Sequence, residues 1–150
     1  MDYQELAEKL VDMRKQAESM VVERNVSRAI EGRPYVLMHL YEEDGKAYPK
    51  ELCADMGVST ARIATILNQL EEQGYITRED DPDDSRHVVV KITEAGTKRA
   101  KEMRSELLDY FALLLEKLGP KDAREYVRLQ QRMISAMVNM RESMEMGVYR

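Results

Sequence analysis

Apolar residues near the start of the chain recur at helical spacing. Leu6, Leu10, Met13, Ala17 and Met20 follow one another at steps of four and three residues, against a charged background. This spacing places them on one face of an amphipathic helix, which we expect to end near residues 24–27. Because an apolar face of this length must be covered, the pattern predicts that another element packs against it.

Turn and capping residues divide the middle of the chain into three short helices. Pro34 suits a first helical turn, and the turn pair Asp44-Gly45 stops that helix. Pro49 opens a second helix that Gly57 ends, and Ser59 is a good N-cap for a third. The apolar residues expected to share a face within each helix are Leu37, Leu40 and Tyr41, then Leu52 and Met56, then Ile63, Ile66, Leu67 and Leu70.

A hairpin is predicted after Gly74, which suits the left-handed position at the end of the third helix. Its candidate strands are residues 75–79 and 87–93. In the second strand Val88, Val90 and Ile92 alternate with Val89 and Lys91. The acidic segment 80–84 lies between the strands, and its Pro82 fits the second position of a type I turn.

The last third of the chain has a helical pattern to its end. Thr93 is the expected cap, and Gly119-Pro120 breaks this helix and starts another. The apolar positions are Ala100, Met103, Leu107, Phe111, Leu114 and Leu118 before the break, and Tyr126, Met133, Met137, Met140 and Met144 after it. The latter intervals form a seam of the coiled-coil kind. Three long amphipathic helices exceed the cover that the middle segment needs, which favours a second subunit.

Composition places the chain among globular proteins of one domain. It has 150 residues, of which 43% are hydrophobic and 34% charged. The longest apolar run, residues 110–115, is too short to span a membrane, and acidic Asp2 and Glu5 do not suit a signal peptide. A cytoplasmic location is therefore expected. The single cysteine, Cys53, excludes an internal disulfide.

Catalytic and metal-binding motifs are missing from the sequence. It contains no phosphate-binding glycine loop, no nucleophile elbow and no zinc motif. His39 and His87 are its only histidines, and both are expected to be ordinary helix and strand residues. The acidic segment fails as a calcium loop, because Arg86 stands where the sixth-position glycine belongs if Asp81 is first. We expect no enzyme activity, no metal and no cofactor.

The segment from Leu52 to Ser59 has the pattern of a helix-turn-helix. A helix, a glycine turn and an N-cap follow one another, and the third helix turns its apolar face inward. Its outward face is slim and mostly uncharged, as entry into a major groove about 12 Å wide requires. The expected contacts are Ser59, Thr60, Ala61, Arg62, Thr65 and Asn68, with Lys50 on phosphate.

The hairpin that follows converts this unit into a winged helix. Arg86 near the hairpin tip is placed to reach an A·T-rich minor groove, and Ser85 is expected to contact DNA beside it. Asp84 can orient the Arg86 side chain by a charge-assisted hydrogen bond. The predicted fold class is mainly α (α+β), a single domain over residues 1–150. Residues 32–96 form its winged helix-turn-helix lobe, and residues 1–31 and 97–150 form long dimerisation helices.

A known family shares this pattern. Asp84-Ser85-Arg86, then Val88, Val90, Ile92 and Thr93-Glu94-Ala95-Gly96, resembles the wing signature of MarR-type transcriptional regulators. Glu51-Leu52 through Gly57-Val58-Ser59 and Leu70 through Gly74-Tyr75-Ile76 are similar to the same family. The resemblance covers about residues 34–96. It implies a homodimer that binds a pseudopalindromic double-stranded DNA operator, and a repressor that a small-molecule effector releases.

Charge favours a second interpretation. The net charge is −5, and between Ser59 and Thr93 four basic residues stand against seven acidic ones. A winged-helix module that binds protein and not DNA is therefore an alternative. A third is redox sensing through Cys53, which we instead expect to be a small buried residue at a helix crossing. An effector pocket, if built from aromatic and soft side chains, would use Met13, Tyr35, Met38, His39, Tyr110 and Phe111.

Overall fold

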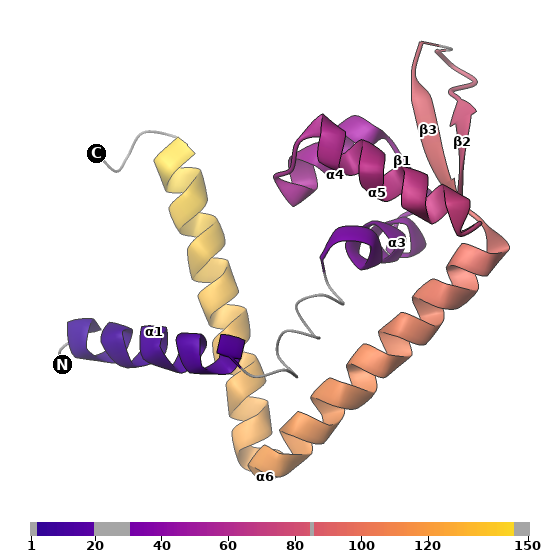
Figure 1. The fold of residues 1–150 in the computed structure, drawn as a ribbon. Coiled ribbons are helices and arrows are strands. Elements are labelled where there is room, and N and C mark those ends of the chain that lie inside the picture. Colours follow the sequence, from indigo (N-terminus) through magenta and orange to yellow (C-terminus); the bar gives the residue numbers. More distant parts are fainter. Residues whose placement is uncertain (1–2, 20–30, 85, 146–150) are drawn as a thin grey trace. The chain divides into compact units, whose positions relative to one another are not determined.

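A computed structural model of the chain describes residues 3–19, 31–84 and 86–145 (Figure 1). Two compact units make up the chain, divided between Leu107 and Leu108. The elements in order are α1 (Tyr3–Ser19), α3 (Gly32–Glu42), β1 (Lys46–Ala47), α4 (Pro49–Met56), α5 (Thr60–Glu72), β2 (Ile76–Asp80), β3 (Val88–Ile92) and α6 (Glu94–Glu145). The predicted fold class, mainly helical with a small antiparallel sheet, is confirmed.

Capping residues begin and end the short helices where the sequence predicted. Pro49 is the first residue of α4, and Gly57 follows its end with φ of 61°. The Ser59 side chain accepts a hydrogen bond from the backbone N–H of Arg62 at 3.2 Å, which makes it the N-cap of α5. Gly74 takes φ of 73° after α5, a conformation that favours glycine. The predicted end of the first helix, and Met20, lie outside the described residues.

The sheet has three strands in the order β1-β3-β2, all antiparallel. Ile76 pairs with Ile92 at the base of the hairpin, and Asp80 pairs with Val88 near its tip. The sequence analysis missed β1, whose Ala47 pairs with Val90. A strand of two residues is too short to show alternation, so only its pairing with β3 reveals it.

The burial of β3 departs from the predicted alternation at its first residues. Val90 is fully buried, but Val89 is also buried, at 3% exposure, whereas Val88 is 41% exposed. Val88 lines an open groove beside Pro49 of α4 and Ala64 of α5. The hairpin extends beyond the helices that cover its base, so the strand end has less cover than its middle (Figure 1).

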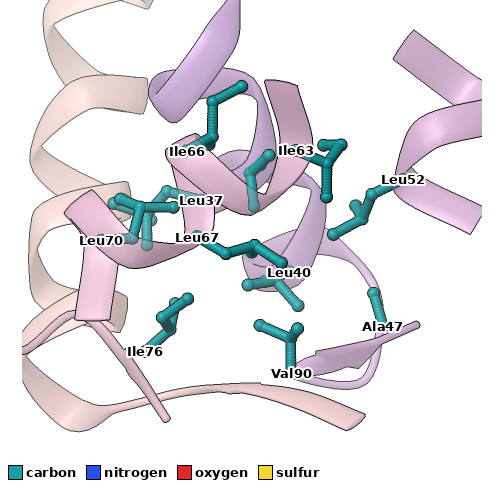
Figure 2. Packing of buried hydrophobic residues seen from close by; sticks show 12 residues of the cluster. Leu37, Leu40, Ala47, Leu52, Ile63, Ile66, Leu67, Leu70, Ile76 and Val90 are labelled. Atoms are coloured by element: carbon teal, nitrogen blue, oxygen red, sulfur yellow. The ribbon is translucent and has the colours of Figure 1, made fainter. Parts of the chain in front are cut away.

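The core lies between α3, α4, α5 and the sheet. Figure 2 shows the apolar face of α5 turned toward Leu37 and Leu40 of α3 and toward Val90 of β3. The core residues are Val36, Leu37, Leu40, Ala47, Leu52, Ile63, Ile66, Leu67, Leu70, Ile76, Val90 and Ala100. Tyr41 and Met56, predicted to be inside, are only partly buried against this cluster. Burial of one face of α5 directs its opposite face outward.

Thr93 and Gly96 fix the start of α6 to the base of the hairpin. The Thr93 hydroxyl accepts a hydrogen bond from the N–H of Gly96 at 3.0 Å and donates one to the carbonyl of Gly74 at 2.7 Å. A Cβ atom on Gly96 would lie 2.1 Å from the carbonyl oxygen of Tyr75, closer than atoms can approach. The predicted cap is confirmed, and glycine is required at Gly96 by this close approach.

Helix α6 is broken at Gly119, as predicted. This residue has φ of 77° and ψ of 163°, so two helical segments meet there, with Pro120 starting the second. Large apolar residues are exposed on both segments, from Leu108 to Met140, and on α1 from Tyr3 to Met13. Within the described residues, no helix combines the length and apolar character needed to cross a membrane.

Candidate nucleic-acid interface

The outward face of α5 carries the side chains predicted to read a major groove. Its apolar residues are in the core, and the opposite face is exposed to solvent from its N-cap onward. An α-helix with its side chains is about 10–12 Å across, which matches a groove about 12 Å wide. The exposed residues are Ser59, Thr60, Ala61, Arg62, Thr65 and Asn68.

Within this face, Arg62 is the one cationic side chain. It forms no ion pair with any described residue. The Thr65 hydroxyl already donates to the carbonyl of Ala61 at 3.0 Å. The Asn68 side-chain oxygen accepts a hydrogen bond from Nη2 of Arg78 at 2.7 Å. The first turn of α5, with Arg62, is therefore the part best able to form new contacts.

Arg86 lies near the hairpin tip with its side chain 87% exposed. Its Nε and Nη2 donate to the two carboxylate oxygens of Asp84, each at 3.0 Å, and its backbone N–H donates to Oδ1 at 3.1 Å. The side-chain hydrogen bonds lower the pKa of the Asp84 carboxyl and raise the pKa of the Arg86 guanidinium. The structure thus brings these two predicted residues together in a bidentate pair. Ser85 lies outside the described residues.

Lys50 and Cys53 line the open groove between α4, α5 and the hairpin. Lys50 is exposed at the start of α4. The groove has a volume of about 580 Å³ and includes Thr60 and Arg78. Cys53 was predicted to be buried, but this free cysteine is only half-buried. The reason is that the groove opens beside the helix crossing, where the prediction assumed close packing.

Four residues, in two pairs that join the hairpin to the rest of the lobe, were missed as functional residues. Arg78 of β2 donates from Nε to Glu71 of α5 at 3.0 Å, and this hydrogen bond lowers the pKa of the Glu71 carboxyl. Tyr48 donates from its hydroxyl to Oδ2 of Asp81 at 2.5 Å. No local motif marks these pairs, because the partners are 7 and 33 positions apart in the sequence.

Four of the seven acidic residues between Ser59 and Thr93 have partners within the lobe. Glu71 pairs with Arg78, Glu79 pairs with Lys91 across the hairpin, and Asp84 pairs with Arg86. Asp81 accepts hydrogen bonds in the turn. These pairs also occupy Arg78, Lys91 and Arg86, so the net charge of the segment stays unfavourable for a polyanion.

A helix, a glycine turn, an outward-facing second helix and a hairpin now stand in one packed lobe. Residues 25–87 match the model of the MarR family. This segment belongs to the MarR family. The match ends within the hairpin, so the family assignment rests on the helix-turn-helix and the first half of the wing.

Named proteins similar to the chain are regulators. YcgE of Bacillus subtilis, described as an uncharacterized HTH-type transcriptional regulator, is 34% identical over 64 residues, which are 43% of this chain and 42% of YcgE. YwhA of Bacillus subtilis, described in the same way, is 28% identical over 120 residues, which are 73% of this chain and 84% of YwhA. The chain thus spans less than half of YcgE in that match. Both relatives are described as HTH-type transcriptional regulators.

Solved structures of the MarR family share the fold. A MarR family protein from Bacillus stearothermophilus superimposes with a TM-score of 0.73 at 17% identity, covering 92% of this chain and 99% of that chain. At this identity the likeness shows the fold alone. It extends the similarity beyond the MarR segment of the sequence, to the long helices that flank it.

The predicted effector-pocket residues are only partly brought together. Tyr35, Met38 and His39 of α3 line a cavity of about 250 Å³, with Glu42 of the same helix and Met103, Arg104 and Leu107 of α6. The rings of Tyr35 and His39 stack with their centroids 6.0 Å apart. Met13 is 65% exposed on α1, and Tyr110 and Phe111 belong to the second unit, where their rings contact each other. No cluster of three or more potential metal ligands occurs among the described residues.

Proposed function

We propose that this protein is a homodimeric, DNA-binding transcriptional regulator, a repressor that a small-molecule effector releases. The observation that carries the proposal is the exposed first turn of α5, in which Arg62 forms no ion pair with a described residue, beside a hairpin that presents Arg86. In this proposal Ser59, Thr60, Arg62 and Thr65 contact the major groove, and Arg86 enters the minor groove. Ala61 and Asn68 line the same face, while Lys50 and Ser85 contact the backbone.

The proposed homodimer is supported by the apolar residues left exposed on α1 and α6. Exposed patches of this extent mark interaction sites. Two copies related by a two-fold axis would present two lobes to a pseudopalindromic site, with half-site centres about one helical turn, roughly 10 base pairs, apart.

Release by an effector is supported by the cavity next to Tyr35, Met38 and His39. Its lining is mostly apolar with a few polar groups, as in small-molecule sites. An effector that binds one arrangement of the lobes better than another would shift the population and weaken operator binding. A spacing that no longer matches successive grooves would lose one of the two half-sites.

The test is fluorescence anisotropy with DNA from upstream of the protein's own gene and with a scrambled duplex, at two salt concentrations. The proposal expects selective binding that weakens with salt. Arg62→Ala should cost about 1–3 kcal/mol on the cognate site and relax its sequence preference. Lys91→Ala, which removes a cation that is paired with Glu79 in the sheet, is the matched control. Equal losses of Arg62→Ala on cognate and scrambled DNA would refute the base-reading role.

The second candidate is a winged-helix module that binds another protein. The acidic turn of the hairpin favours it, since Asp83 and Asp84 stand beside Arg86 there. This function expects a negligible salt slope and no effect of Arg86→Ala on DNA. Screening genomic fragments separates it from a wrongly chosen operator, because a DNA-binding protein would select some fragment. Redox sensing, the third alternative, expects Cys53→Ser to abolish a response to oxidant.

A further inference from the structure

Asp81, at the start of the hairpin turn, is a buried carboxylate held by hydrogen bonds. It is 8% exposed, the one buried charged residue among those the structure describes. Oδ2 accepts from the Tyr48 hydroxyl at 2.5 Å, and Oδ1 accepts from the backbone N–H of Asp83 at 2.9 Å. No described lysine or arginine forms an ion pair with it. A buried charge needs partners, so this carboxylate depends on the Tyr48 hydroxyl.

Tyr48 is itself fixed to the body of the lobe. It directly precedes α4, the first helix of the helix-turn-helix. Its backbone N–H donates to the Glu51 carboxylate at 3.1 Å, and its carbonyl accepts from the N–H of Leu52 at 3.1 Å. Leu52 is fully buried in the core. The Tyr48 hydroxyl therefore reaches the hairpin turn from a rigid starting point.

A continuous path of hydrogen bonds leads from Asp81 to Arg86. The backbone N–H of Asp81 donates to the carbonyl of His87 at 2.8 Å, and the N–H of His87 donates to the carbonyl of Asp84 at 2.9 Å. The Asp84 carboxylate then holds the Arg86 guanidinium. These hydrogen bonds connect Asp81, Asp84, Arg86 and His87 to one another, and the Tyr48–Asp81 contact connects them to the start of α4.

Among the described residues, the hairpin turn lies beyond both the last strand pair and the ion pair to α5. The last strand pair joins Asp80 to Val88, and Val88 is 41% exposed. The Arg78–Glu71 pair ties β2 to α5 closer to the base of the hairpin. The Tyr48–Asp81 hydrogen bond also lowers the pKa of the Asp81 carboxyl and raises that of the Tyr48 hydroxyl, so both keep the forms that bond at neutral pH.

We propose that Tyr48 is a positioning residue for the wing, acting through Asp81 to hold Arg86 at a fixed place relative to α5. DNA presents its major and minor grooves at a set separation, so a wing held in place beforehand binds without the cost of ordering it. This role rests on the proposed DNA-binding function. The attachment itself is a property of the free protein and is tested without DNA.

The first experiment compares hydrogen exchange in Tyr48→Phe and in the wild-type protein. The substitution removes only the hydroxyl. Tyr75→Phe is the matched control, because Tyr75 also packs against the core and no hydrogen bond joins its hydroxyl to a described residue. We expect the amides of Asp81 and His87 to exchange about tenfold faster in Tyr48→Phe, the equivalent of one lost hydrogen bond to a charged group. Unchanged exchange at both amides would overturn the proposal.

The second experiment measures operator affinity by anisotropy in a double-mutant cycle. Tyr48→Phe should weaken binding about tenfold in the wild-type background and have no further effect in the Arg86→Ala background. A loss of similar size in both backgrounds would mean general damage to the lobe and would overturn the positioning role. Asp81→Asn, which removes the charge from the other side of the contact, is expected to repeat the result of Tyr48→Phe.

The two experiments separate this proposal from the proposed function. If exchange accelerates but affinity stays unchanged while the wild-type protein binds its operator, Tyr48 has no positioning role in DNA binding. If the wild-type protein binds no genomic fragment, the proposed function fails and the role of Tyr48 toward DNA fails with it. The exchange result then still decides whether Tyr48 holds the turn.

Discussion

The winged lobe and the long helices use the same apolar periodicity with opposite results. Every buried hydrophobic residue of the described chain lies between Val36 and Ala100. On α1, and on α6 from Leu108 onward, apolar residues at helical spacing remain exposed. The winged lobe buries its apolar faces within a single chain, whereas the long helices leave theirs exposed to solvent.

In the proposed function, the lobe carries DNA recognition and the long helices carry dimer assembly. The lobe must present α5 and the hairpin at fixed positions, and its closed core supplies the rigidity that such presentation needs. The long helices carry surface that a single chain leaves open, which suits contacts with a second copy. Stability of the lobe should therefore depend on the chain itself, and stability of the long helices on protein concentration.

The largest effect is expected where a charge enters the exposed apolar surface. Leu114→Glu places a carboxylate on α6 where Leu114 is 43% exposed in the single chain. If a second copy covers this face, each carboxylate costs several kcal/mol to bury, and symmetry doubles the cost. Sedimentation analysis should show a shift from dimer toward monomer. Ser105→Glu, on an exposed polar position of the same helix, is the control. A dimer that persists in Leu114→Glu would contradict the assignment of this apolar face to the dimer interface.

A core truncation is expected to act on the lobe alone. Leu67→Ala removes a side chain that is 2% exposed, and such deletions cost about 2–5 kcal/mol. Chemical denaturation should show this loss at every protein concentration. Leu129→Ala, on the exposed part of α6, is the counterpart, with a change that depends on concentration. If the loss of unfolding free energy depended on protein concentration in the same way for both variants, the two regions would not differ as we expect.

A smaller effect is expected at the junction where α6 leaves the hairpin. In Gly96→Ala the new methyl group meets the Tyr75 carbonyl and the Ile92 side chain, so the backbone must shift. Overpacking of this kind costs about 1–3 kcal/mol. Thermal unfolding followed by circular dichroism measures it, with the exposed neighbour Ala95→Ser as control. A stability equal to that of the wild type would show that α6 is not held tightly at its start.

The smallest effect is the pH dependence of the wing. Hydrogen bonds lower the pKa of Asp81 and Asp84 below the ordinary 3.8. The stability these two contacts contribute is complete above the unfolded pKa and is lost as pH falls through the lower folded pKa. Exchange at the wing, corrected for its intrinsic pH dependence, should stay constant from neutral pH to about 5 and rise below about 4. A loss of protection already between pH 6 and 5 would assign the change to other groups.

Local signals in the sequence account for most element boundaries. Capping and turn residues act on the backbone within a few positions, so their effect can be predicted from the sequence without knowing the fold. Those that did so here are Pro49, Gly57, Ser59 and Thr93. The outward face of α5 was also predictable, because the helical spacing of its apolar residues places them on one side of the helix and the polar residues on the other. The family match rests on the same segment.

Contacts between distant residues were decided only by the tertiary structure. Strand β1 exists because β3 pairs with it, and Val88 is exposed because the helices end before the hairpin does. The Tyr48–Asp81 contact joins positions 33 residues apart, which no periodicity encodes. The sequence by itself determined the helices, the turns and which faces are apolar, since these depend on neighbours along the chain. Which side chains meet, and so how the wing is held, depends on packing in three dimensions.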